Sequence, residues 1–471
     1  MAKPAIIRLR EASRIVSASS VIIGVYIAYA VATVAVFRLR PPMQAALISI
    51  LGGWMFLPVA DYPARFIVSE QYTVDVIGTL LPSSLLITKA LICPIVVLAC
   101  LALHAPHLFR AFRPARLDAA IAAFCLSPLI AWAAGRVPAA AGLVQAGYLA
   151  GTWGMAWMIG RLVLSDRSGR EGLVTALIVS GLVLLPVAIL EGLQPPGIYA
   201  RVFGPHPFQT DGAARYLGFR PVGFFEHGNQ YGIWVAMAAL AAFGRALLRR
   251  RRTDAMIAGL LVLCAIASQS AGAIILLLLG VVWLLASARV RRIGIVVTAA
   301  LLVTGGPGYV SGKLPLEYWA KSTAAGQVVY HGLREAGRGS LGWRVKRDQE
   351  ALPTIQRAAL TGYGVWDWWR PLGSHPSGLP LLIVGQFGVL SLIFATIAIF
   401  GGALRESWAG RSGILAVIVI AAGVDSWLNS YAYFPAILAA AALARPAWRS
   451  KLDSTAAGAG QTLESSRKAT G

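Results

Sequence analysis

Charged residues are scarce in this sequence, and acidic residues are the scarcest of them. Only 13% of the 471 residues are charged, with 20 Asp or Glu against 42 Lys or Arg. Soluble domains carry about a quarter charged residues, so this composition argues against a soluble fold. Instead, 57% of the residues are hydrophobic, in runs long enough to cross about 30 Å of hydrocarbon as helices. The sequence predicts an all-α, polytopic membrane protein.

Cysteine is also rare, and its positions exclude a disulfide framework. No CxxC pair occurs, and no cysteine lies in a polar loop where disulfides usually form. Each lies inside an apolar run, so we interpret the thiols as small buried side chains. The four are Cys93, Cys100, Cys125 and Cys264.

The sequence lacks the motifs that mark many metal-dependent and nucleotide-dependent enzymes. It holds no HExxH, no Walker-type loop, no GxSxG and no group of carboxylates with metal-ligand spacing. We therefore expect neither a metal ion nor another cofactor.

The net charge of +22 does not indicate nucleic acid, because the basic residues form short clusters between apolar runs. Short loops rich in Lys and Arg stay on the cytoplasmic side of a membrane. The clusters therefore report topology, and the expected partner is the lipid bilayer. They are Arg110, Arg113 and Arg116; Arg249 to Arg252; Arg289, Arg291 and Arg292; and Arg445, Arg449 and Lys451.

Hydropathy gives an odd number of candidate spans, whereas the basic residues near both termini predict that both ends lie inside. One segment before residue 104 is therefore misjudged, with 43–60 and the weak stretch from Val74 to Leu86 as the two candidates. We predict about twelve transmembrane helices. The candidate spans are 19–37, 43–60, 86–103, 117–134, 139–162, 173–190, 231–248, 255–269, 272–288, 293–305, 379–401, 413–426 and 431–444.

This topology leaves two functional loops outside the cytoplasm, 192–230 and 306–378, named loop 1 and loop 2 below. Long loops cross a membrane largely regardless of their charge, so the basic residues of loop 2 do not contradict its position. The other parts are N-terminal helices in 1–191, central helices in 231–305, C-terminal helices in 379–444 and a cytoplasmic tail, 445–471, whose composition predicts disorder.

Each loop carries an arginine motif. Loop 1 reads Arg220-Pro-Val-Gly-Phe-Phe-Glu-His-Gly-Asn229, and loop 2 reads Gly-Trp-Arg344, followed by Gly362-Tyr-Gly364 and Ser-His375-Pro. Arginine presents a fixed fork of donors that suits phosphate oxygens. Two such forks beside a membrane could hold a lipid-linked diphosphate. Tryptophans in loop 2 could stack on sugar rings or anchor the loop at the interface; these are Trp343, Trp366, Trp368 and Trp369.

These motifs resemble those of the O-antigen ligase and polysaccharide polymerase superfamily of bacterial membrane glycosyltransferases. That family carries Arg-x-x-Gly-x-Phe with an Asn six residues after the Gly. Arg220, Gly223, Phe225 and Asn229 match every position. In its large periplasmic loop the family carries a Gly-Arg, a Leu-x-Gly-x-Gly turn, a histidine and glycines at the start of the next span. The corresponding residues are Arg344, Leu360, Gly362, Gly364, His375, Gly385 and Gly388.

The resemblance has three departures. Asp348 stands where the family often has Trp, four residues after the second arginine. Ser270-Ala271-Gly272 stands where Ser-Arg-Gly is common, so that arginine is missing. His375 lies thirteen residues before Gly388, whereas the family histidine usually lies eleven before it. Either two residues are inserted, or Ser377 holds the histidine position.

The resemblance implies transfer of a glycan from a polyprenyl-diphosphate carrier to an acceptor hydroxyl, on the periplasmic face of the bacterial inner membrane and without a metal. Arg220 and Arg344 would stabilise the diphosphate leaving group, and His375 would orient or deprotonate the acceptor. Ion pairs with Glu226 or Glu350 are the alternative for the arginines, and a structural role is the alternative for His375. The expected substrate-binding residues are Arg215, Gly223, Asn229, Gly362 and Gly364.

Three functions remain open on the sequence. A polymerase would use another lipid-linked repeat unit as acceptor, a ligase would use lipid A core or protein, and a transporter or flippase would catalyse no transfer. Transporters place ionisable residues at mid-membrane. Few charges lie in these spans, with Lys89 and Asp425 the candidates, which favours an enzyme. Other polysaccharide-assembly proteins are further possible partners.

Overall fold

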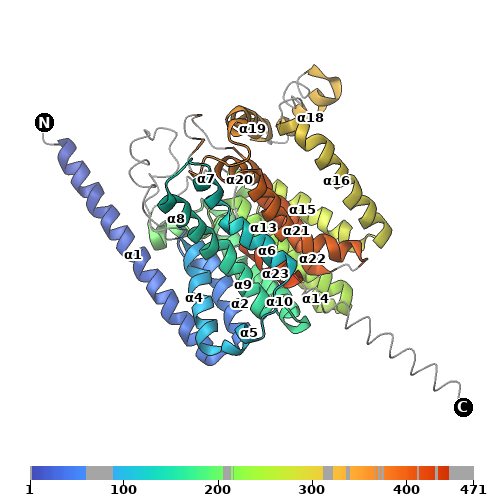
Figure 1. Cartoon of the computed structure of the whole chain (residues 1–471). Coiled ribbons are helices and arrows are strands. Elements are labelled where there is room, and N and C mark those ends of the chain that lie inside the picture. Colours follow the sequence, from blue (N-terminus) through green and yellow to red (C-terminus); the bar gives the residue numbers. More distant parts are fainter. Residues whose placement is uncertain are drawn as a thin grey trace, which may run out of the picture.

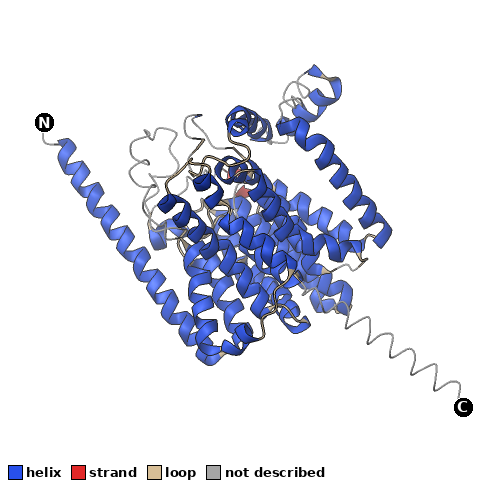
Figure 2. Ribbon diagram, in the orientation of Figure 1, coloured by secondary structure: helices blue, strands red, loops and turns tan. Residues whose placement is uncertain are grey.

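The computed structural model of the chain is built almost entirely of helices (Figure 2). The structure describes residues 3–59, 88–204, 214–215, 217–310, 322–335, 340–365, 368–369, 372, 376–410, 413–429 and 433–444. Within these ranges the strands are β1 (Ala214–Arg215) and β2 (Gly218–Phe219), which pair antiparallel. The predicted all-α class is thus confirmed for the described chain.

The helices before the first arginine motif form the left side of the molecule in Figure 1 and extend into its centre, where α6 and α10 are labelled. Several begin with proline in the first turn, where its missing N–H has no helical partner to lose. They are α1 (Lys3–Leu39), α2 (Pro42–Phe56), α4 (Lys89–His104), α5 (Pro106–Arg110), α6 (Arg116–Leu126), α7 (Pro128–Ala133), α8 (Ala139–Leu149), the π-helix η2 (Ala150–Gly154), α9 (Met155–Val163), α10 (Arg167–Val183), α11 (Leu185–Leu193) and α12 (Ile198–Phe203).

The helices after that motif form the centre and the right side of the same view. They are α13 (Gly228–Arg249), α14 (Arg252–Ala267), α15 (Ala271–Leu285), α16 (Ala288–Val310), α18 (Ala324–Glu335), α19 (Ser340–Arg357), α20 (Leu379–Phe387), α21 (Val389–Trp408), α22 (Ile414–Leu428) and α23 (Phe434–Leu443).

Four helical segments in the described chain are long and apolar enough to cross a membrane: Val21–Leu39, Arg167–Leu193, Gly228–Arg249 and Val389–Trp408. Shorter apolar helices accompany them, and together they indicate a membrane protein. The shorter ones are Pro42–Phe56, Lys89–His104, Ala271–Leu285, Ile414–Leu428 and Phe434–Leu443.

The predicted spans coincide with helices, but four of them are interrupted where the sequence suggested one continuous helix. Span 173–190 divides at Leu184, between α10 and α11. Span 117–134 divides at Pro128 into α6 and α7, and span 139–162 contains the π-helical turn η2. Span 379–401 divides at Gly388, which has a φ of +86°. Proline removes a helical hydrogen bond, and a positive φ ends the helix. The candidate span 43–60 contains α2, and the stretch 74–86 lies outside the described residues.

Helix α13 is the centre of the packing, and residues 230–242 of it are all buried. It packs against α10, α14, α15 and α22. Five alanines in this stretch let the neighbouring backbones approach closely, as is common between helices in membranes. This packing fixes the start of α13, which follows the loop 1 motif directly. The alanines are Ala236, Ala238, Ala239, Ala241 and Ala242.

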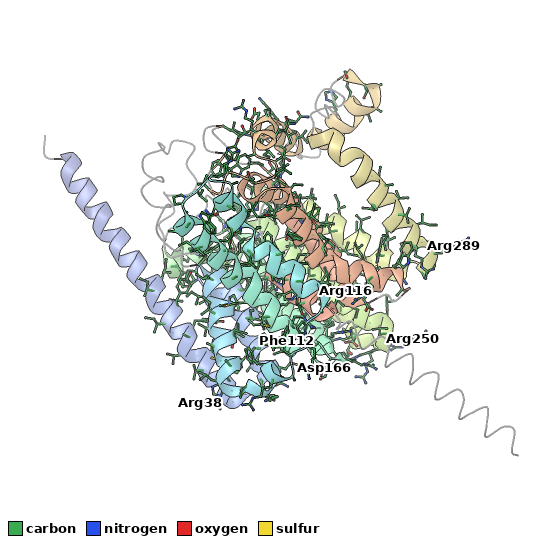
Figure 3. All side chains as sticks on the ribbon, in the orientation of Figure 1. Arg38, Phe112, Arg116, Asp166, Arg250 and Arg289 are labelled. Carbon is green, nitrogen blue, oxygen red and sulfur yellow. The ribbon has the colours of Figure 1, made fainter. Side chains whose placement is uncertain are left out.

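The described basic clusters, 110–116, 249–252 and 289–292, lie at helix ends away from α19, where Figure 3 labels Arg116, Arg250 and Arg289. Arg292 Nε donates to the Trp408 carbonyl at 2.8 Å, which joins the start of α16 to the end of α21. This arrangement is consistent with basic clusters that share one side of a membrane. The four cysteines are buried and free, as predicted.

Candidate functional site

The turn of the loop 1 motif is held by a carboxylate that the sequence did not single out. Glu191, 1% exposed at the end of α11, accepts the N–H groups of Val222 at 2.8 Å and Gly223 at 2.7 Å through Oε2. Its Oε1 accepts those of Gly197 and Ile198, both at 3.1 Å. A buried carboxylate requires such donors. Gly223 has a φ of +59°, a region that favours glycine, so its described role is to shape this turn. Its contact with substrate stays a prediction.

Lys89 holds the next residues of the same motif. Its Nζ donates to the carbonyls of Phe224 at 2.7 Å and Trp54 at 3.0 Å. It also lies over the rings of Trp54 and Phe225, 5.4 and 5.5 Å from their centres. Lys89 is the first residue of α4. Its charge therefore serves to fix the loop at a helix end.

The β1–β2 hairpin is attached to the turn between α14 and α15. Gln269 Oε1 accepts the Leu217 N–H, and Gln269 Nε2 donates to the Phe219 carbonyl, both at 3.3 Å. Arg215 lies in β1, next to the motif. Its side chain is outside the described part of the chain, so its role as a substrate contact stays a prediction.

Arg220 and Arg344, from the two loops, meet at a pair of asparagines. Arg220 Nη2 donates to Asn229 Oδ1, which also accepts the Ser270 hydroxyl at 3.1 Å. Asn229 Nδ2 donates to Asn429 Oδ1 at 2.9 Å, and Arg344 Nη1 donates to the same oxygen at 2.9 Å. The sequence-predicted residues Arg220, Asn229 and Arg344 are therefore neighbours, joined through Asn429.

Asn429 and its partner Asp425 were not assigned to the site from the sequence. Asp425 is 1% exposed in the last turn of α22, and its Oδ1 and main-chain carbonyl each accept Asn429 Nδ2 at 3.0 Å. The available signal was an aspartate inside an apolar run with an asparagine four residues later, a spacing that puts both on one helix face. Arg344 Nη1 also donates to the Leu428 carbonyl at 2.7 Å, where a cation suits the negative end of α22.

The described partners of Arg344 are neutral oxygens, which leaves its charge available. The carboxylate considered as an alternative partner, Glu350, lies 4.0 Å from Lys346 Nζ and from Arg347 Nη1. The other, Glu226, accepts the Gln230 amide at 3.2 Å. The other arginine of the site, Arg220, is buried, with 7% of its surface exposed.

Asp348, the departure from the family tryptophan, connects α19 to the segment that contains the predicted histidine. It lies one turn after Arg344, and its Oδ1 accepts the Ser377 N–H at 2.7 Å. Ser377 is buried, and its Oγ has no hydrogen-bond partner among the described residues. His375 lies outside those residues, so its catalytic role stays a prediction.

The Leu-x-Gly-x-Gly turn packs against the break between α20 and α21. Gly362 and Gly364 have φ of +67° and +71°. The N–H groups of Tyr363 and Gly364 donate to the carbonyls of Gly385 at 2.8 Å and Gln386 at 2.9 Å. A Cβ at 362 would lie 2.4 Å from the Gln386 oxygen. The described role of both glycines is this close packing, and substrate contact stays a prediction.

Trp368 belongs to a small hydrophobic core. It is 5% exposed, packs with residues of α19 and α20, and stacks on Tyr363 with ring centres 6.1 Å apart. Because its ring is buried, Trp368 is available neither to stack on a sugar nor to anchor the loop at the membrane interface. Trp369 is partly buried against the same core. The side chains of Trp343 and Trp366 are outside the described part.

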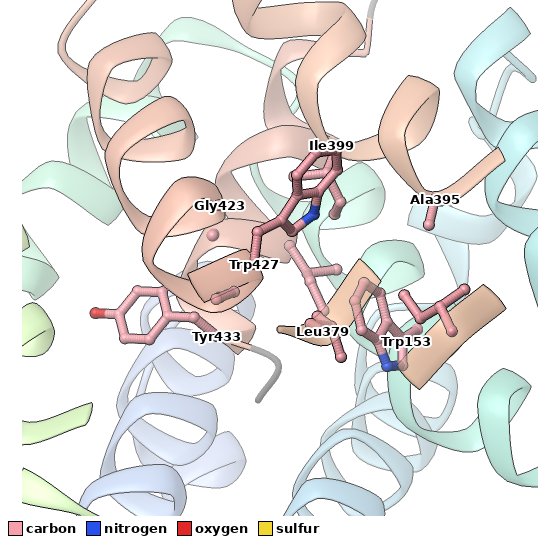
Figure 4. A pocket seen from close by; sticks show the side chains of 11 residues that line it. Trp153, Leu379, Ala395, Ile399, Gly423, Trp427 and Tyr433 are labelled. Atoms are coloured by element: carbon pink, nitrogen blue, oxygen red, sulfur yellow. The ribbon is translucent and has the colours of Figure 1, made fainter. Parts of the chain in front are cut away.

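A cavity of about 20 Å³ lies between η2, α20, α21, α22 and α23, lined mainly by apolar side chains with Trp153, Trp427 and Tyr433 (Figure 4). A space of this size holds about one water molecule. It is too small for a sugar, so we do not assign it to the donor or the acceptor.

One carboxyl group of the loop 1 motif has a pKa that differs from its value in water. Burial raises the pKa of the Glu226 carboxyl above its usual range, although the Lys89 ammonium and the Gln230 amide oppose the rise. Glu226 therefore takes up a proton at a higher pH than an exposed glutamate.

No metal-ligand group of three or more His, Cys, Asp or Glu occurs in the described ranges. No family model, curated protein or solved structure matches this chain. The likeness to the ligase and polymerase superfamily therefore depends on the sequence motifs alone.

Proposed function

We propose that this protein is a glycosyltransferase of the bacterial inner membrane, with about twelve transmembrane helices. It transfers a glycan from a polyprenyl-diphosphate carrier to an acceptor hydroxyl on the periplasmic face. The observation that carries the proposal is the meeting of Arg220 and Arg344, one from each loop, at the Asn229–Asn429 pair.

This geometry suits a diphosphate leaving group. When the bond between the sugar and the carrier breaks, its electron pair stays on a phosphate oxygen. Two guanidinium groups fixed in advance stabilise that developing charge, and the stabilisation is strongest where water is excluded. The acceptor oxygen forms the new bond to the anomeric carbon, and its proton passes to a base, for which we propose His375.

The position of the cluster supports a site at one face of the membrane. Asn229 lies at the start of α13, Ser270 between α14 and α15, and Asn429 at the end of α22. In the proposed topology these three helix ends fall on the same side as the two loops. The basic clusters fall on the other side.

The alternative of a transporter or flippase is less well supported. Transporters place ionisable residues and broken helices at mid-membrane. The breaks at Pro128, η2 and Gly388 carry no charged side chain. Lys89 is the first residue of its helix, and Asp425 lies in the last turn of its helix. In this proposal the polar cluster contacts the diphosphate of the donor, and polymerases and ligases use the same kind of donor. It is therefore compatible with a lipid-linked repeat unit, lipid A core or protein as acceptor.

The test is transfer from a synthetic polyprenyl-diphosphate glycan by the purified protein in nanodiscs. We expect Arg220→Ala and Arg344→Ala each to lower the rate by about 10²-fold or more, as loss of one charge-stabilising donor does. Arg344→Lys should recover little, because lysine lacks the planar fork. Arg167→Ala is the control, since its exposed pair with Glu171 is worth little. Full activity in either alanine variant would remove that arginine from the site.

A further inference from the structure

A line of hydrogen bonds runs from the buried Asp425 carboxylate to both arginines, and its direction is fixed at both ends. A main-chain carbonyl can only accept, so Asn429 presents Nδ2 to the Asp425 carbonyl at 3.0 Å, beside Asp425 Oδ1 at 3.0 Å. A guanidinium can only donate, so the amide oxygens of Asn429 and Asn229 face Arg344 and Arg220. Asn229 Nδ2 donates to Asn429 Oδ1 at 2.9 Å, which completes the line of hydrogen bonds.

We propose that Asp425 and Asn429 are positioning residues of the diphosphate site. They set the two arginines side by side and keep the Arg344 charge available for the substrate. This inference rests on the proposed function, and it adds two residues of α22 that the loop motifs do not contain.

The neutral amide between the carboxylate and the arginine is the central feature. A carboxylate directly against Arg344 would form an ion pair and compete with the diphosphate for the same donors. With Asn429 interposed, the carboxylate fixes the amide, and only the dipole of the amide oxygen faces the guanidinium. The attraction between opposite charges weakens with their separation, so this arrangement orients Arg344 without neutralising it.

The anchor also lies on a rigid element. Helix α22 packs against α13, α15, α21 and α23, and Asp425 is almost fully buried within this packing. Arg344 comes from α19, in the middle of loop 2. A site whose groups are fixed to packed helices keeps its geometry better than a site built on loops alone.

The decisive variant is the exchange Asp425→Asn with Asn429→Asp. It keeps one carboxylate, one amide and a hydrogen bond between positions 425 and 429, but it moves the negative charge against Arg344. We expect the affinity for unglycosylated polyprenyl diphosphate, measured by titration in nanodiscs, to fall at least tenfold. The donor KM should rise while the acceptor KM stays unchanged, and the thermal unfolding midpoint should stay close to that of wild type.

Two further variants keep the test decisive if the exchange does not fold. Asn429→Ser removes the amide without adding charge and should also weaken binding of the polyprenyl diphosphate severalfold. Asp254→Asn is the matched control, because this buried aspartate pairs with Arg245 at 2.9 Å near the basic cluster 249–252. It should leave that affinity unchanged.

The outcomes separate this inference from the proposed function. If wild type binds the polyprenyl diphosphate and Arg344→Ala does not, the proposed function survives its binding test. Wild-type affinity in the exchange variant or in Asn429→Ser would then overturn the positioning role alone. If wild type itself binds no polyprenyl diphosphate, both the proposed function and this inference are wrong.

Discussion

The side chain of Arg220 lies directly over Gly228, the first residue of α13. A Cβ at position 228 would stand 2.6 Å from Arg220 Nε and 2.8 Å from its Cδ. The glycine therefore makes room for the arginine, and the three nearest atoms that a methyl group there would meet all belong to this long, flexible side chain.

Gly228→Ala should consequently impair activity without unfolding the protein. Alanine favours a helix over glycine by about 0.5–1 kcal/mol, so the unfolding midpoint should not fall. The guanidinium must move away from Asn229, and a displacement of about 1 Å in a site can lower a rate about 10²-fold. Gly259→Ala in α14, where a Cβ meets nothing within 4 Å, is the control. Wild-type transfer by Gly228→Ala would show that the position of Arg220 is not critical.

The stability of the protein should depend on pH through Glu226. Burial raises the pKa of its carboxyl in the folded state, so between the unfolded value, about 4.3, and the folded value the native protein binds more protons. Stability then falls as pH rises through that window. Glu226→Gln removes this loss, so its stability relative to wild type should increase from pH 4 to pH 8 in thermal unfolding. A difference independent of pH would contradict the raised pKa.

The histidine of loop 2 can be tested without knowing its geometry. If His375 accepts the acceptor's proton, His375→Gln should lower the transfer rate by about 10²–10⁴, and acidification that protonates the imidazole should also lower it. Near-normal activity in His375→Gln would leave it an orienting role only. Activity in His375→Ala together with inactivity in Ser377→Ala would assign the family's histidine position to Ser377.

The topology predicts that residues 192–230 and 306–378 lie outside the cytoplasm, because the basic clusters hold the other helix ends inside. A cysteine introduced at position 330 should react with an impermeant thiol reagent on intact cells. The native cysteines are buried and should give little background. Labelling of Tyr330→Cys only after permeabilisation would overturn the functional proposal.

Transfer should not depend on an added metal ion. The sequence holds no metal-ligand motif, and the charge of the leaving group is assigned to arginines. Treatment of the purified protein with EDTA should leave the transfer rate unchanged. A loss restored by a divalent cation would show that the arginines are not sufficient.

Local sequence patterns predicted much of the fold. Apolar runs predicted the helices because backbone groups in lipid must be satisfied within their own segment. The breaks were less visible. Gly388 and the π-helical turn η2 interrupt segments whose side chains are as apolar as their neighbours, so hydropathy did not reveal them.

The sequence by itself determined that the protein is helical and apolar enough for a membrane, and it pointed to Arg220, Asn229 and Arg344. Only the tertiary structure decided that these three meet, and that they meet through Asn429 and Asp425. It also revealed Glu191 beneath the loop 1 turn. The reason is physical: hydropathy and spacing report neighbours along one helix. Contacts between the ends of α11, α13, α19 and α22 depend on how the helices pack.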